Sequence, residues 1–78
     1  MEFSEAVHKR IEYYQKKNNM NNWKLYIASG LPKATVYSCM NAKDKLPRLD
    51  TLLHICEAFG ITIKEFFADD IFLDVEQD

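Results

Sequence analysis

The stretch from Asn22 to Asn41 holds a Gly and a Pro two residues apart, and this pair constrains the fold more than any other feature. Gly30 can adopt the positive φ that ends a helix, because it has no Cβ to clash with the backbone. Pro32 has a fixed φ and needs no amide partner, which suits the first turn of a new helix. The turn between them therefore predicts one helix over residues 22–28 and another over residues 33–41.

Two short helices joined by a tight turn that contains Gly are typical of a helix-turn-helix, which places its second helix in the major groove of DNA. Asn21 is a good N-cap for the first helix, in which Leu25 and Ala28 are expected to face inward. Val36, Cys39 and Met40 are the residues of the second helix that are expected to face inward. Its opposite side then exposes Lys33, Ala34, Tyr37, Ser38 and Asn41, with Thr35 near the start.

Three further helices are expected around this pair. The first covers residues 3–17, with a buried face marked by Val7, Ile11 and Tyr14. The fourth covers residues 49–59 and ends at Gly60. A capping box at Thr62 and Glu65 opens a fifth helix, which places Phe66 and Phe67 on the core. The expected buried stripe of the fourth helix is Leu49, Leu52, Leu53, Cys56 and Phe59. The fold class that we predict is all-α, with five helices and no strand.

The charge distribution divides the 78-residue chain into two parts. The whole chain has a net charge of −2, which is unexpected for a DNA-binding protein. Residues 1–68 hold all ten Lys and Arg residues with seven acids, whereas residues 69–78 hold five acids and no base. We therefore predict a mildly basic folded domain over 1–68 and an acidic-apolar tail over 69–78. The tail has four alternative interpretations: packing on the domain, a solubilising end, a competitor for the basic face, or a dimer strand.

Several function classes are not supported by the sequence. We find no run of about 18 apolar residues and no signal peptide, so a cytoplasmic protein without membrane contact is expected. Cys39 and Cys56 are expected to be buried reduced thiols, since no ligand spacing supports a metal site with His8 and His54. No pattern of catalytic residues, cofactor motif or small-molecule site is evident, so we expect a protein that is not an enzyme.

The chain resembles the Cro and phage-repressor family of helix-turn-helix domains, the xenobiotic-response-element type, over roughly residues 7–67. The resemblance rests on Arg10-Ile11, on Leu25 with the Ser-Gly-Leu turn, on Thr35-Val36 and on the run from Pro47 to Thr62. It implies a lambda-repressor-like fold and a transcriptional regulator that binds double-stranded DNA. The turn sequence Ser-Gly-Leu-Pro-Lys-x-Thr resembles that of short Gram-positive and prophage regulators in this family.

The resemblance also assigns roles to individual residues. The base-reading positions fall on Lys33, Ala34, Thr35, Tyr37 and Ser38. The DNA-backbone positions fall on Asn22, Asn41, Lys43, Lys45 and Arg48. Their chemistry agrees with these roles, because a Lys can donate to guanine, Ala and Thr can meet a thymine methyl group, and Ser can donate or accept. The basic residues of the loop over 42–48 would add affinity on any sequence.

The chain departs from the family pattern at three places. Tyr26 stands where an Ala is usual, so its ring must point outward or widen the crossing of the two helices. Gln15 and Met40 replace a buried pair of a basic residue with Glu, and both members are absent together. Pro32 replaces the usual Ser or Thr cap, so a capping bond is lost.

Some side chains keep more than one interpretation at this point. Tyr37 packs over the turn or touches bases, and Trp23 is more often a packing residue than one that stacks on DNA. We expect His8 to be exposed and His54 to be structural. The leading hypothesis is a phage or prophage regulator that binds a two-fold operator as a homodimer. The alternative is a protein-interaction module on the same fold, such as an antitoxin or anti-repressor, with weak or no operator binding.

Overall fold

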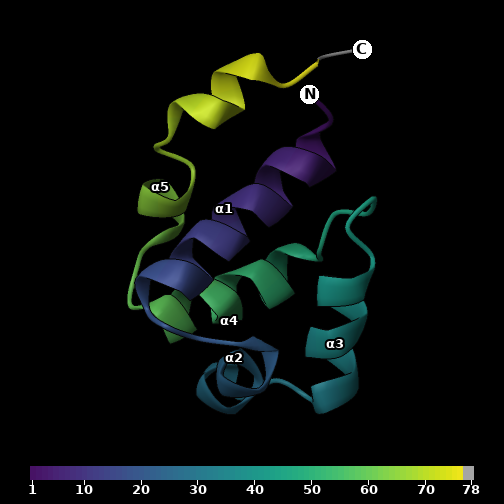
Figure 1. The fold of residues 1–78 in the computed structure, drawn as a ribbon, viewed down its shortest axis with the longest axis vertical. Helices are drawn as coiled ribbons and strands as arrows, with labels where there is room; N and C mark the ends of the chain where they lie inside the picture. The colour runs from purple at the N-terminus through teal and green to yellow at the C-terminus, as the bar shows by residue number, and fades with distance from the viewer. Residues whose placement is uncertain (77–78) are drawn as a thin grey trace.

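The computed structural model describes residues 1–76, which form five α-helices and one 3-10 helix (Figure 1). The helices are α1 (Phe3–Lys17), α2 (Asn22–Ser29), α3 (Lys33–Asn41), α4 (Leu49–Phe59), α5 (Ile63–Phe66) and the 3-10 helix η1 (Asp70–Asp74). The predicted bounds of the first, third and fourth helices are confirmed, and α2 ends one residue later than predicted. No strand lies within residues 1–76, so the all-α prediction is confirmed. None of the helices in this part of the chain has the length and hydropathy of a membrane span.

One hydrophobic core joins all five α-helices. Its members come from every helix, and those that are entirely buried include Ile11, Leu25, Val36, Ile55 and Phe66. The ring of Tyr14 stacks on that of Phe59, with centroids 5.6 Å apart and planes at 25°. The predicted inward faces of α1 and α5 are therefore confirmed for Tyr14 and Phe66, while Phe67 is half-buried.

The buried stripe of α4 differs from the predicted one. Leu49 is 82% exposed and Leu53 is 46% exposed, while Thr51 and Ile55 are buried instead. The apolar stripe that contacts the core runs through Leu52, Ile55, Cys56 and Phe59, at helical spacing. Leu49 lies one turn before this stripe begins, where the helix has just left the loop and its side chain has no core to pack against.

The two helices of the turn are packed through Ser29 rather than Ala28. Ala28 was expected to face inward and is exposed, because Ser29 occupies the buried position. The Ser29 hydroxyl donates to the Tyr26 carbonyl at 3.0 Å and accepts from the Leu31 amide at 3.2 Å. Both hydrogen-bonding capacities of this hydroxyl are thus used inside the turn. Tyr26 is half-buried and packs against the core.

The ends of the short helices have the predicted capping features. The Asn21 side chain accepts from the Lys24 amide at 2.8 Å, and Gly30 has the left-handed φ of 71°. Pro32 makes no side-chain cap at the start of α3, as expected. Thr62 and Glu65 form both bonds of the capping box. The bounds of α2, α3 and α5 are therefore encoded locally.

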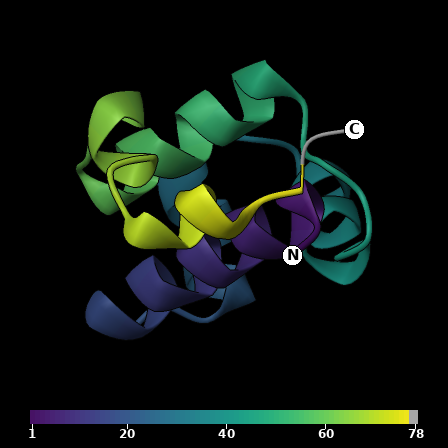
Figure 2. The same ribbon diagram turned by 90° about the horizontal axis from the view of Figure 1, so that it is seen from above.

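The C-terminal segment folds back along α1 (Figures 1 and 2). Phe72 of η1 lies against the rings of Phe3 and Phe67, with centroids 6.4 Å and 4.8 Å away. The Glu76 amide donates to the Met1 carbonyl at 3.0 Å. Among the alternatives for the tail, packing on the domain is what residues 69–76 do, whereas Asp78 lies outside the described residues. The division of the chain at residue 68 stays a prediction.

Candidate nucleic-acid interface

Two buried residues orient α3 so that its outer side faces solvent. Val36 and Met40 anchor the helix in the core. Their spacing of four residues fixes the rotation of the helix about its axis. Of the residues of α3 that were predicted to contact DNA, Ala34, Ser38 and Asn41 are exposed on the opposite side, and Lys33 is exposed at the start of the helix. Thr35 and Tyr37 are half-buried. This side carries hydroxyl, amide and ammonium groups of the kind that bind base edges.

The Lys33 side chain lies between two aromatic rings. Its ammonium group is 5.3 Å from the centroid of the Trp23 ring and 5.7 Å from that of Tyr37. Both distances fall within the range of about 6 Å in which a cation is attracted to a ring face. Tyr37 thus packs beside the predicted base-reading lysine. Trp23, which sequence reasoning left as a packing residue, contacts the same lysine.

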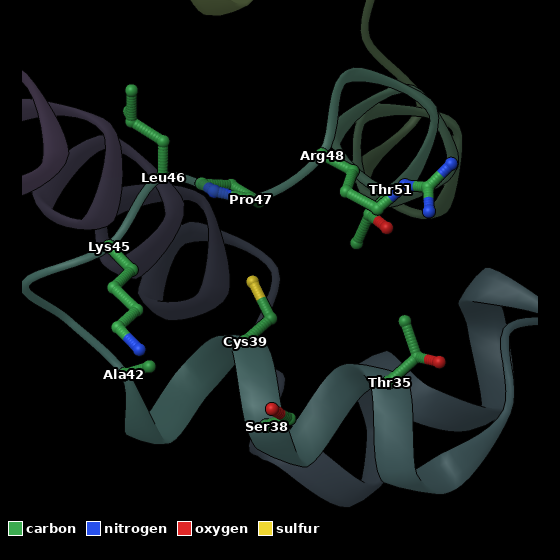
Figure 3. Close-up of a pocket in the computed structure, with 9 residues that line it drawn as sticks. All are labelled: Thr35, Ser38, Cys39, Ala42, Lys45, Leu46, Pro47, Arg48 and Thr51. Carbon is green, nitrogen blue, oxygen red and sulfur yellow. The ribbon is translucent and has the colours of Figure 1, made fainter.

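A groove of about 320 Å³ separates α3 from the start of α4 (Figure 3). In Figure 3 the Cys39 sulfur and the Thr51 side chain point into this groove from opposite sides, while Leu46 points away. The residues that line it are Thr35, Ser38, Cys39, Ala42, Lys45, Leu46, Pro47, Arg48 and Thr51. Two of the predicted backbone contacts, Lys45 and Arg48, therefore lie at one groove beside α3.

The three basic residues of the loop differ in how their charges are compensated. The Lys43 ammonium donates to Glu12 of α1 at 2.8 Å, and this hydrogen bond lowers the pKa of the Glu12 carboxyl. Arg48 lies 3.3 Å from Asp50, in an exposed pair. No carboxylate within residues 1–76 forms an ion pair with Lys45. Of the three, Lys45 has the charge most available to a phosphate.

Asn22 begins α2 and is held by a neighbour from α1. Its side-chain oxygen accepts from the Gln15 amide group at 2.9 Å. Gln15 and Met40, the two departures from the family pattern noted in the sequence, both line a cavity of about 70 Å³. The bond from Gln15 leaves the amide NH₂ of Asn22 as a donor at the start of a helix, where backbone amides also favour phosphate.

His8 is buried, contrary to the prediction that it is an exposed helical residue. Its Nε2 atom lies 3.0 Å from the Lys45 carbonyl oxygen, and the side chain bridges α1 to the loop before α4. The hydrogen-bonding partner is a backbone group 37 residues away, which no local pattern indicates. His54, in contrast, is exposed, with Nδ1 4.0 Å from Glu57.

The two cysteines are free thiols inside the helical packing. Cys56 is buried and Cys39 is half-buried. Burial raises the pKa of the Cys39 thiol, and burial together with the nearby Glu57 carboxylate raises the pKa of Cys56 to about 11. Residues 1–76 contain no group of three His, Cys, Asp or Glu side chains placed to hold a metal ion.

An all-helical domain with this turn, and with a second helix that presents hydrogen-bonding side chains, belongs to the DNA-binding helix-turn-helix class. Residues 10–70 match the family model described as the Cro/C1-type HTH DNA-binding domain, and the chain belongs to this family. The family consists of DNA-binding regulators, so double-stranded DNA is the partner that membership implies. Neither the curated proteins nor the solved structures that were compared with the chain gave a match.

Proposed function

We propose that this protein is a sequence-specific transcriptional regulator that inserts α3 into the major groove of an operator half-site. The observation that carries the proposal is the exposed side of α3. Ala34 and Ser38 lie on it, Lys33 is exposed at the start of the helix, and the buried Val36 and Met40 fix the helix against the core. The proposed base-reading residues are Lys33, Ala34, Thr35, Tyr37 and Ser38.

The proposed backbone contacts surround this side of α3. Asn22 lies at the start of α2, and Lys45 and Arg48 lie at the groove beside α3. Asn41 and Lys43 complete the set, but Lys43 must leave Glu12 to reach a phosphate. The acids of residues 69–76 do not interfere, because this segment packs along α1. The net negative charge of the chain is therefore compatible with DNA binding.

Binding to duplexes selected from a random pool tests this function. Fluorescence anisotropy should give a clear preference for selected over random duplexes. Lys33→Met should lower the affinity for the selected duplex about 5-fold or more, since one good base contact contributes about 1–3 kcal/mol. Lys45→Gln should weaken binding to both duplexes equally and reduce the salt slope by about 0.9. A wild-type protein without preference would overturn the proposal and favour the protein-interaction module instead.

We further propose that the protein binds a two-fold operator as a homodimer, through two exposed leucines, Leu46 in the loop before α4 and Leu49 at its start. Half-sites lie about 34–36 Å apart, so the dimer contact must keep the two recognition helices close together. Leu46 lines the groove beside α3 and is 52% exposed, and Leu49 is the first residue of α4 and is 82% exposed. Segment η1 lies toward the other end of the 34 Å long axis from α2 (Figure 1). Copies joined end to end through η1 would hold their recognition helices too far apart.

Two leucines of similar exposure test this arrangement. Leu49→Glu should convert a dimer to a monomer in analytical ultracentrifugation without lowering stability, because the side chain is 82% exposed. Leu73→Glu, at a leucine that is 80% exposed on η1, should leave the dimer intact. The reverse result would place the interface on η1.

The phage or prophage origin that we propose rests on the turn sequence, and adjacent integrase or lysis genes would support it.

A further inference from the structure

The side chain of Lys33 is exposed and has four rotatable bonds, and its charged end lies over two aromatic rings. The ammonium lies over Trp23 at 5.3 Å and over Tyr37 at 5.7 Å. Tyr37 lies one turn after Lys33 on the same helix, whereas Trp23 belongs to α2. Of the two ring contacts of Lys33, only the one with Trp23 therefore connects α3 to α2.

The Trp23 ring is half exposed and contacts a second ring of the same helix. Its face is set by an edge contact with the ring of Tyr26, with centroids 5.2 Å apart and planes at 62°. Tyr26 in turn packs against the hydrophobic core. A continuous series of contacts thus runs from the core through Tyr26 and Trp23 to the Lys33 ammonium. The unusual Tyr in α2 gains a physical purpose, because a small residue there would leave the indole without support.

We propose that Trp23 is a positioning residue that holds the Lys33 ammonium in the orientation that selects a G·C base pair; this rests on the proposed function. A guanine presents two acceptors, O6 and N7, in the major groove, and an ammonium group can donate to both. A lysine that is already restrained loses less conformational freedom when it binds. It also makes fewer contacts with the wrong base, because it cannot bend away to another acceptor. Trp23 therefore increases discrimination at one base pair without touching the DNA.

The test measures discrimination at the base pair that Lys33 reads. Lys33→Met identifies that pair. It is the position in a selected duplex where replacing G·C by A·T weakens binding of the wild type but not of Lys33→Met. Trp23→Leu should then reduce the discrimination by about 2–5-fold, the ratio that corresponds to one exposed cation–π contact. Its affinity for random duplexes should not change. Trp23→Phe keeps an aromatic face and should restore most of the discrimination.

Ile27→Ala is the matched control, since Ile27 is 61% exposed on the same helix one turn later. This variant should leave discrimination unchanged. If Trp23→Leu and Ile27→Ala discriminated equally well while the wild type remained sequence-specific, the positioning role of Trp23 would be overturned. The proposed function would still stand. If Trp23→Leu bound selected and random duplexes with equally reduced affinity, the positioning role would also be overturned, because Trp23 would then contact DNA directly. A wild type without sequence preference would instead reject the proposed function.

A second measurement needs no DNA and no change at Trp23. The chain has one tryptophan, so the indole emission comes from Trp23 alone. Lys33→Met should change the indole emission of the free protein, since the cation leaves the ring. Lys24→Met, which removes a charge from the neighbouring position of α2, should not change it. Identical spectra for the wild type and Lys33→Met would contradict the proposal.

Discussion

The Nε atom of Arg10 donates to the carbonyl oxygen of Phe66 at 2.7 Å, across 56 residues of sequence. The same guanidinium donates to the Glu65 carbonyl at 2.9 Å and to the Tyr14 hydroxyl at 3.0 Å. These carbonyls lie at the end of α5, which has only four residues and therefore few hydrogen bonds of its own. Arg10 completes the end of this helix from α1, and it also lies 3.5 Å from Asp69 at the start of the C-terminal segment.

Replacing Arg10 should destabilise the fold strongly. Arg10→Met removes the side-chain donor of the buried Phe66 carbonyl and one of the donors of the Glu65 carbonyl, which still accepts from the Ala68 amide. The change should lower the free energy of unfolding by about 2–4 kcal/mol. Arg10→Lys should recover little, because an ammonium group cannot reproduce the planar fork of donors. Urea denaturation followed by circular dichroism measures both. Lys9→Met, at the exposed neighbouring residue, should change stability by less than about 0.5 kcal/mol.

Truncation of Phe72 tests whether the C-terminal segment belongs to the folded unit. The ring contacts Phe3, Phe66 and Phe67, so Phe72→Ala should cost about 2 kcal/mol, less than for a fully buried ring. DNA affinity of the folded variant should not change. The control is Leu73→Ala, whose exposed side chain makes it nearly neutral in the same denaturation experiment. An equally small effect of both changes would mean that η1 is not part of the cooperative unit.

Gly30 and Gly60 form a natural pair for testing the turn. Each has a φ near 70°, and a Cβ added to either meets no atom within 4 Å. Ala at either position should therefore cost about 1 kcal/mol from backbone strain alone, and Asn should cost less. Thermal unfolding should give similar losses for the two sites. In DNA binding, only Gly30→Ala should reduce affinity, because strain there changes how α3 is placed against α2.

The pair of Glu12 with Lys43 should restrain DNA binding. Glu12→Gln releases Lys43, so affinity for every duplex should rise and the salt slope should increase by about 0.9 if one phosphate contact is gained. Glu5→Gln removes an acid whose partner, Lys9, lies 3.5 Å away on the same helix and should not affect the slope. A decrease in affinity of Glu12→Gln would mean that the pair orders the loop instead.

The same pair gives a pH dependence with a defined sign. The Glu12 carboxyl has a pKa lowered from its ordinary 4.5, so its contribution to stability is present above that value. It is lost as the pH falls through the lower pKa of the folded state. The difference in urea midpoint between the wild type and Glu12→Gln should therefore be small and constant near neutral pH. It should decrease as the pH falls below 4.5 and vanish below the lower pKa of the folded state.

The helices could be predicted from the sequence because their ends are local. Gly30, Gly60 and the capping box at Thr62 need only their neighbours, and the structure confirms each of them. The exposure of Leu49 could not be predicted in this way. Periodicity gives the direction of an apolar face, but it does not say whether another element lies opposite that face.

The candidate site was predictable in its composition and less so in its contacts. The exposed side of α3 follows from the buried positions of Val36 and Met40. The bond of His8 to the Lys45 carbonyl and those of Arg10 to α5 involve backbone groups 37 to 56 residues away, for which the sequence holds no signal. Trp23 did carry a usable signal, because it lies beside Asn22, a predicted DNA-backbone position.

The hydrogen bond between the Glu76 amide and the Met1 carbonyl brings the two ends of the described chain together. Both ends lie on the side of α1 that is remote from α2 (Figure 1). A fluorescent protein or an affinity tag attached at either end would therefore leave the α3 surface open. The same proximity suits circular permutation, in which a short linker closes the old ends.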